Sequence, residues 1–166
     1  MPTPFKERAI AVIVNNRPDV LARIAGTFSA RGFNIESISA NITRDPSVTK
    51  IIITTLTTPD TIAKVIKQLN RLVDVREAKR LRRPDAVRRE MIIARLPRVK
   101  ERQAAIDELV KAHCGKTVHE ESDALILEFT GDTEELEAIL TRLEELGMED
   151  FTRSGVIALE RGGSRM

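Results

Sequence analysis

Apolar side chains follow two different periods along the first part of the chain, and each change of period marks a new element. Residues 9–14 form an uninterrupted apolar run rich in β-branched side chains, as expected for a buried strand. From residue 20 the apolar positions are spaced by one, three and four, which places them on one face of a helix: Val20, Leu21, Ile24, Ala25 and Phe28. The pattern therefore predicts a strand over 9–14 and an amphipathic helix that Gly32 closes.

The next forty or so residues continue this alternation of strands and helices. Apolar and polar residues alternate over 37–43, the period-2 signature of a half-buried strand, and a turn over 44–47 leads into a returning strand over 48–56. Thr58 is placed to cap a helix that has Pro59 in its first turn. The apolar stripe of that helix is Ile62, Val65, Ile66 and Leu69. With a last strand over 72–81, the predicted order of this half is βαββαβ.

The second half of the chain repeats that order with different residues. Its predicted elements are a strand over 87–96, a helix over 99–112, short strands over 116–119 and 125–129, a helix capped at 131–133 and ended by Gly147, and a strand over 148–159 broken near Ser154-Gly155. An internal period of roughly 80 residues indicates a tandem repeat. The expected fold is α+β, with two ferredoxin-like βαββαβ domains over 1–81 and 86–166 and a linker over 82–85.

Composition narrows the classes of protein that the chain can belong to. It is 42% hydrophobic and 31% charged, and its longest apolar run is far shorter than the ~20 residues of a membrane span. The amino terminus, MPTPFKER, lacks the apolar stretch of a signal peptide. The single Cys114, with His113 and His119 nearby, gives neither a disulfide nor a set of metal ligands. We expect a cytoplasmic protein with no membrane partner and no metal site.

Charge and motifs argue against nucleic-acid binding and against catalysis. Up to Leu81 the chain has 13 Lys/Arg and 7 Asp/Glu, and after it 14 and 18, so the halves carry +6 and −4, which sum to +2. Aromatic residues make up only 3%, too few for the stacking surfaces of RNA-binding sheets. No nucleophile elbow, phosphate loop or dinucleotide fingerprint occurs, and adjacent residues such as His113 and Cys114 point about 100° apart on a helix. We therefore expect no catalytic residues and no nucleic-acid partner.

Several features converge at the entrance of the first predicted helix. The first N–H groups of a helix have no internal partner and attract a carboxylate. Asn16 and Asn34 can donate and accept, as an ammonium beside a carboxylate requires, and Val20, Leu21 and Ile35 can contact a short branched side chain. This pattern indicates a receptor for a small amino acid, although a capped helix without a ligand has the same local sequence.

Four blocks of sequence carry a resemblance to a known family. They are NNRPDVLARIAGTFSARGFNIESI at 15–38, QLNRLVDV at 68–75, VRREMIIARL at 87–96 and RSGVIALERG at 153–162. In order and spacing the chain resembles the small regulatory subunit of acetohydroxyacid synthase, also called acetolactate synthase. The resemblance implies that the first half is an ACT domain, which pairs with another subunit and binds an amino-acid effector at the dimer interface.

The resemblance also implies a function in the biosynthesis of valine, leucine and isoleucine. A subunit of this kind is not an enzyme by itself. It binds and activates the large catalytic subunit, which carries thiamine diphosphate, magnesium and FAD, and it confers feedback inhibition, usually by valine. By resemblance, Asn16, Val20 and Leu21 line the effector site from one chain and Asn34 and Ile35 from the other, so a homodimer or a higher oligomer is expected. The alternative is a free-standing tandem ACT sensor that controls another protein.

One position departs from the family pattern. The family normally has Gly where this chain has Asp19, directly after Pro18. Two carboxylates ~4 Å apart repel by about 1 kcal/mol in water and by up to about 4 kcal/mol at an effective dielectric near 20. Asp19 also belongs to the residue types that cap helices, so we expect it to cap this entrance itself and inhibition by valine to be weak or absent, while activation of the large subunit is retained. If Arg17 neutralises Asp19, or Asp19 pairs with the effector's ammonium, binding persists.

Overall fold

The computed structural model describes residues 5–162, which form two compact units. Among the described residues, the first unit consists of 5–88 together with 156–162, and the second consists of Arg89–Gly155. Residues 156–162 thus join the first unit, whereas the expected division at 82–85 assigns them to the second half.

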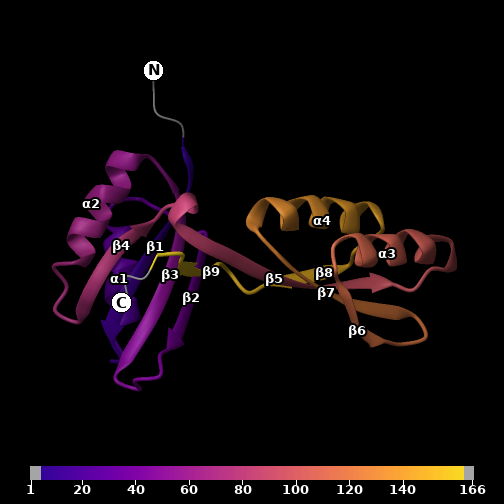
Figure 1. The fold of residues 1–166 in the computed structure, drawn as a ribbon, viewed down its shortest axis with the longest axis horizontal. Coiled ribbons are helices and arrows are strands. Elements are labelled where there is room, and N and C mark those ends of the chain that lie inside the picture. The colour runs from indigo at the N-terminus through magenta and orange to yellow at the C-terminus, as the bar shows by residue number, and fades with distance from the viewer. Residues whose placement is uncertain (1–4, 163–166) are drawn as a thin grey trace. The chain divides into compact units, whose positions relative to one another are not determined.

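The first unit has the βαββαβ order that the sequence predicts (Figure 1). Its elements are β1 (Lys6–Asn15), α1 (Val20–Ser29), β2 (Ser37–Ile42), β3 (Val48–Thr57), α2 (Pro59–Leu69) and β4 (Val75–Leu81). The four strands form an antiparallel sheet in the order β2-β3-β1-β4. A single 3₁₀ turn, η1 (Arg83–Asp85), follows β4. This part of the fold prediction is confirmed.

Strand β1 is apolar at every position over 9–14 because both of its faces are covered. One face packs against the helices in a core that includes Ile10, Val12, Ile24 and Phe28. The opposite face joins a smaller cluster made of Ala9, Ala11, Ile52, Leu81, Ala86 and Val156. After Val156, β9 (Ile157–Glu160) pairs with β5, and the Arg161 N–H donates to the Asp85 carbonyl at 2.9 Å. A strand that is buried on both faces loses the period-2 alternation of a half-exposed one.

Local turn chemistry sets the ends of the helices. The Thr58 hydroxyl accepts a hydrogen bond from the Thr61 N–H and so caps α2, as predicted. Gly32 adopts a φ of +69° after α1, the left-handed conformation that favours glycine. The prediction that the last strand of this unit begins at residue 72 is wrong. The Leu72 N–H bonds to Leu69 and the Val75 N–H to Leu72, so residues 72–74 form a turn and β4 begins at Val75.

The second unit repeats the order in a second antiparallel sheet, β6-β7-β5-β8. Its elements are β5 (Ala86–Pro97), α3 (Lys100–Ala112), β6 (Lys116–Glu120), β7 (Ala124–Gly131), α4 (Thr133–Glu145) and β8 (Asp150–Arg153). Helices α3 and α4 cover one face of this sheet (Figure 1), and the Asp132 carboxylate caps α4 at the predicted position. The predicted break near Ser154-Gly155 separates β8 from β9. Among the helices within residues 5–162, none is long and apolar enough to cross a membrane.

Candidate functional site

A cavity of about 490 Å³ opens where the turn after β1 enters α1. Its walls come from the end of β1, the first residues of α1, and strands β2 and β3. The lining residues are Val14, Asn15, Asn16, Arg17, Pro18, Val20, Leu21, Ala40, Ile42, Thr49 and Ile51. The volume lies within the range of small-molecule sites, roughly 300 to 1,000 Å³. The first unit therefore has a concave site of its own at the helix entrance.

The floor of this cavity is aliphatic, and two further aliphatic side chains stand at its mouth. Val14, Val20 and Ile51 are buried, whereas Leu21 on α1 is 44% exposed and Ile42 on β2 is 62% exposed. Exposed aliphatic groups lose contact with water when a ligand covers them, which favours binding of a nonpolar side chain. This wall fits a short branched hydrocarbon group.

The entrance of α1 is left without a side-chain cap. Asp19 occupies the N-cap position with helical dihedral angles, φ −95° and ψ −4°, and its side chain makes no capping hydrogen bond. The first regular helical bond runs from the Arg23 N–H to the Asp19 carbonyl at 3.1 Å. N–H groups in the turn before that bond carry partial positive charge, so the entrance attracts an anion such as a carboxylate.

The self-capping prediction for Asp19 is therefore wrong. The carboxylate of Asp19 turns outward and forms an ion pair with Arg23, one helical turn later. Opposite charges four residues apart are neighbours on a helix surface, so this contact competes with capping. Asp19 does not line the cavity, and Arg17 is not its partner.

Three polar side chains beside the cavity contact the carboxylate of Asp74. Its side chain is 12% exposed and has three donors at 3.4 Å: Nε of Arg17, Nη1 of Arg23 and Nδ2 of Asn15. The Asn15 N–H also donates to the Asp74 carbonyl at 2.8 Å. Asp74 immediately precedes β4. These contacts therefore connect the turn between β1 and α1 to the loop before β4.

The structure brings together part of the predicted site. Asn16, Val20 and Leu21 line the cavity, and the Asn16 side chain donates to the Pro46 carbonyl at 3.0 Å. Asn34 and Ile35 lie outside its lining: the Asn34 carbonyl accepts a hydrogen bond from Thr55, and Ile35 packs against the core of the first unit. Their placement in the cavity of a second chain stays a prediction.

Sequence reasoning missed the residues that the hairpin contributes. Ala40 and Ile42 from β2 and Thr49 and Ile51 from β3 complete the wall opposite α1. The alternation of Ile38, Ala40 and Ile42 predicted a half-buried strand, and this is wrong for the chain by itself, because these three side chains are exposed. The alternation also does not say which helix the strand meets. Arg17 was also missed as a lining residue.

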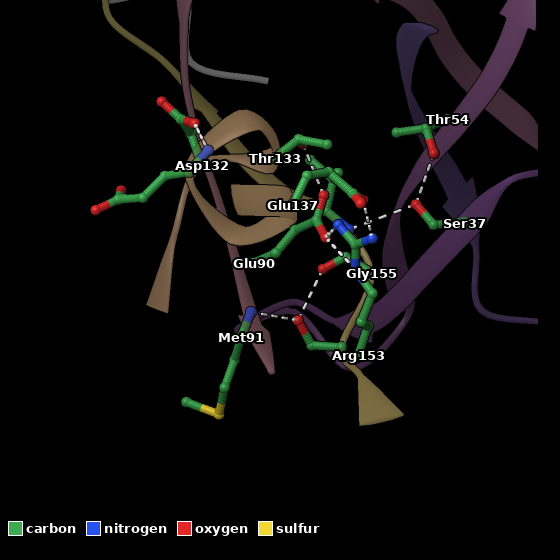
Figure 2. Close-up of polar contacts among 12 residues, drawn as sticks. Ser37, Thr54, Glu90, Met91, Asp132, Thr133, Glu137, Arg153 and Gly155 are labelled. Carbon is green, nitrogen blue, oxygen red and sulfur yellow. Dashed lines mark hydrogen bonds and ion pairs between the residues drawn. The ribbon is translucent and has the colours of Figure 1, made fainter. Parts of the chain in front are cut away.

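A second polar cluster lies within the second unit and has a structural role (Figure 2). Glu90 on β5 is only 5% exposed and accepts hydrogen bonds from Nε of Arg153 at 3.0 Å and from the Thr133 hydroxyl at 2.8 Å. Arg153 also pairs with Glu137 on α4. These groups satisfy one another and join β5, β8 and α4. Within residues 5–162, no group of three His, Cys, Asp or Glu side chains is placed to hold a metal ion.

Comparisons with known proteins match both units. The family model described as an AHAS small subunit-like ACT domain matches residues 10–77, and the model for the small subunit of acetolactate synthase matches residues 89–162. The probable acetolactate synthase small subunit of Archaeoglobus fulgidus is 32% identical over 159 residues, which cover 96% of this chain and 99% of that protein. The acetolactate synthase small subunit of Mycolicibacterium smegmatis is 31% identical, with 92% and 90% covered.

A solved structure agrees with these matches over nearly the whole chain. The crystal structure of the acetolactate synthase small subunit from Thermotoga maritima superposes with a TM-score of 0.86 at 28% identity, covering 95% of this chain and 99% of that one. Small subunits of this family are regulatory and non-catalytic, which agrees with the expectation that the chain is not an enzyme by itself. The chain therefore belongs to the acetolactate synthase small-subunit family, and its first unit is that family's ACT domain.

Proposed function

We propose that this chain binds and activates the large catalytic subunit of acetolactate synthase in the cytoplasm, and that a branched-chain amino acid in the α1 cavity inhibits the complex. Family membership supports the catalytic partner. The single observation that supports the effector site is the cavity itself, which combines an uncapped helix entrance with an aliphatic wall. Thiamine diphosphate, magnesium and FAD are expected on the large subunit, and none on this chain.

The two ends of a zwitterionic amino acid match opposite sides of this cavity. The carboxylate lies at the entrance of α1, where helix N–H groups favour negative charge. The side-chain amide oxygen of Asn16 accepts from the ammonium. The branched side chain packs on Leu21 and Ile42, which fits valine and its homologues better than polar amino acids.

A second copy of the chain completes this site in our proposal. Strand β2 ends the order of the first sheet, so its outer edge offers unpaired backbone groups to another strand. Ile42 at the mouth of the cavity belongs to this strand, and Asn34 and Ile35 lie just before it, with Glu36 between. Pairing of two β2 edges would bring Asn34 and Ile35 of one protomer toward the cavity of its partner.

The test reconstitutes the purified chain with the large subunit from the same source. We expect the chain to raise acetolactate formation and valine to lower it again. Leu21→Asp, which places a charge on the cavity wall, should abolish the effect of valine but keep activation. Leu56→Asp is the matched control, because Leu56 is 50% exposed but lies outside the cavity lining.

Three results would contradict parts of this proposal. Absence of activation would overturn the proposal that this chain activates the large subunit. Valine binding without any effect on the large subunit would favour the free-standing sensor. Full inhibition by valine in the Leu21→Asp variant would place the effector site elsewhere.

A further inference from the structure

Arg17 is the charged residue among those that line the cavity, and its guanidinium is held only loosely. Its side chain is 68% exposed, and its Nε lies 3.4 Å from the nearer oxygen of Asp74. Good charge-assisted N–H···O bonds are about 2.7 to 2.9 Å long, and exposed pairs of this kind contribute little to stability. Arg17 can therefore leave Asp74 without disturbing the fold.

We propose that Arg17 captures the effector's carboxylate and that Asp74 competes with the effector for Arg17, so that this internal competition sets the affinity of the site. The inference rests on the proposed function. A guanidinium presents a planar fork of N–H donors that matches a carboxylate in a bidentate manner. The bound carboxylate then lies between this fork and the N–H groups of the α1 entrance, and both favour its charge.

Asp74 is suited to be a competitor because it does not depend on Arg17. When Arg17 leaves, Arg23 and Asn15 remain as donors to its carboxylate. Its backbone carbonyl stays bonded to the Asn15 N–H at 2.8 Å, whatever the side chain does. Asp74→Asn is therefore a conservative change that keeps the size of the side chain but removes the negative charge that holds Arg17.

Arg23 cannot take the place of Arg17. It does not line the cavity, and its guanidinium is already shared between Asp19 and Asp74. The two arginines thus have separate roles. Arg23 restrains two aspartates beside the site, and Arg17 faces the ligand.

A double-mutant cycle tests the competition, with valine binding measured by calorimetry on the full chain at low ionic strength. Arg17→Met should weaken binding about tenfold or more, equivalent to at least ~1.4 kcal/mol. Asp74→Asn alone should strengthen binding several-fold, because the competitor is gone. In the Arg17→Met background, Asp74→Asn should have no effect on affinity, because the guanidinium for which Asp74 and the effector compete is absent.

Two further variants separate capture from a general effect of charge or folding. Arg17→Lys keeps the charge but lacks the fork, so it should bind between wild type and Arg17→Met and should restore the gain from Asp74→Asn. Arg31→Met is the matched control, because Arg31 is exposed near the end of α1 and bonds to Gln68 rather than to a cavity residue. It should leave affinity unchanged.

The outcomes distinguish this inference from the function on which it rests. A wild-type chain that binds none of valine, leucine and isoleucine would overturn the proposed function. If Arg17→Met unfolds at the normal temperature and binds valine as tightly as the wild type, only the role of Arg17 would be overturned. Equal effects of Asp74→Asn in both backgrounds, or weaker binding in Asp74→Asn alone, would overturn the competition.

Discussion

Replacing Arg23 with Met should expose the effector site to the charge of Asp19. In the native chain the Asp19 carboxylate is paired with Arg23 and turned away from the cavity, although Pro18 and Val20 on either side of it are lining residues. Without the guanidinium, the negative charge of Asp19 is unscreened about 8 Å from the expected position of the ligand carboxylate, roughly two residues along the chain.

The expected loss of affinity follows from Coulomb's law. Two unit charges about 8 Å apart repel by about 0.5 kcal/mol at the dielectric constant of water and by about 2 kcal/mol at an effective value near 20. Arg23→Met should therefore weaken valine binding by about 2-fold to about 30-fold. Asp19 is half exposed, so the lower part of this range is expected.

Calorimetric titration of four proteins tests this reasoning. Asp19→Asn alone should change valine affinity little, because the carboxylate it removes is already neutralised. Asp19→Asn combined with Arg23→Met should recover the part of the affinity that the charge of Asp19 costs, but not the part lost because Asp74 no longer has Arg23 as a donor. If the double variant binds valine as weakly as Arg23→Met does, the charge of Asp19 is not the cause of the lost affinity.

Three further predictions concern the stability of the fold. Arg153→Met leaves the nearly buried carboxylate of Glu90 without its ion partner, so denaturant unfolding should show a loss of about 2 to 3 kcal/mol, and adding Glu90→Gln should recover part of it. Gly115→Ala places a methyl group against the ring of Phe129, so the free energy of unfolding should fall by about 1 to 3 kcal/mol and the melting temperature should fall with it. An unchanged melting curve would contradict this packing. Hydrogen bonds from the side chain and backbone of Ser47 lower the pKa of Asp45 below its ordinary 3.8, so the turn between β2 and β3 is stabilised above that pH and loses this contribution as the pH falls through the folded-state pKa. The protection factors of the amides in this turn, which are corrected for the intrinsic pH dependence of exchange, should fall with acid in the wild type and should already be low at neutral pH in Asp45→Asn.

Most of the fold could be predicted because its elements carry strong local signals. The apolar run of β1, the helical spacing after residue 20 and the caps at Thr58 and Asp132 each indicate one structure only. The start of β4 was missed because Leu72 and Val73 are as apolar as strand residues, whereas the chain needs them in the turn that leaves α2. Local patterns also do not say which unit β9 joins, because its pairing with β5 is fixed by contacts between distant residues.

The candidate site was predictable to the extent that it is local. Asn16, Val20 and Leu21 were found because they surround one helix entrance. The β-hairpin wall was missed because it depends on how a sheet packs against a helix. The predicted orientation of the Asp19 side chain was wrong because helix capping and an ion pair compete for the same carboxylate. The sequence does not show that the ion pair with Arg23 is the one that forms.

An NMR titration of the labelled chain with valine shows whether the entrance of α1 binds a branched-chain amino acid. We expect saturable shifts of the backbone amides of residues 19–21 and of the Leu21 and Ile42 methyl groups. Saturable shifts confined to the second unit, or no shifts with valine, leucine or isoleucine, would contradict it.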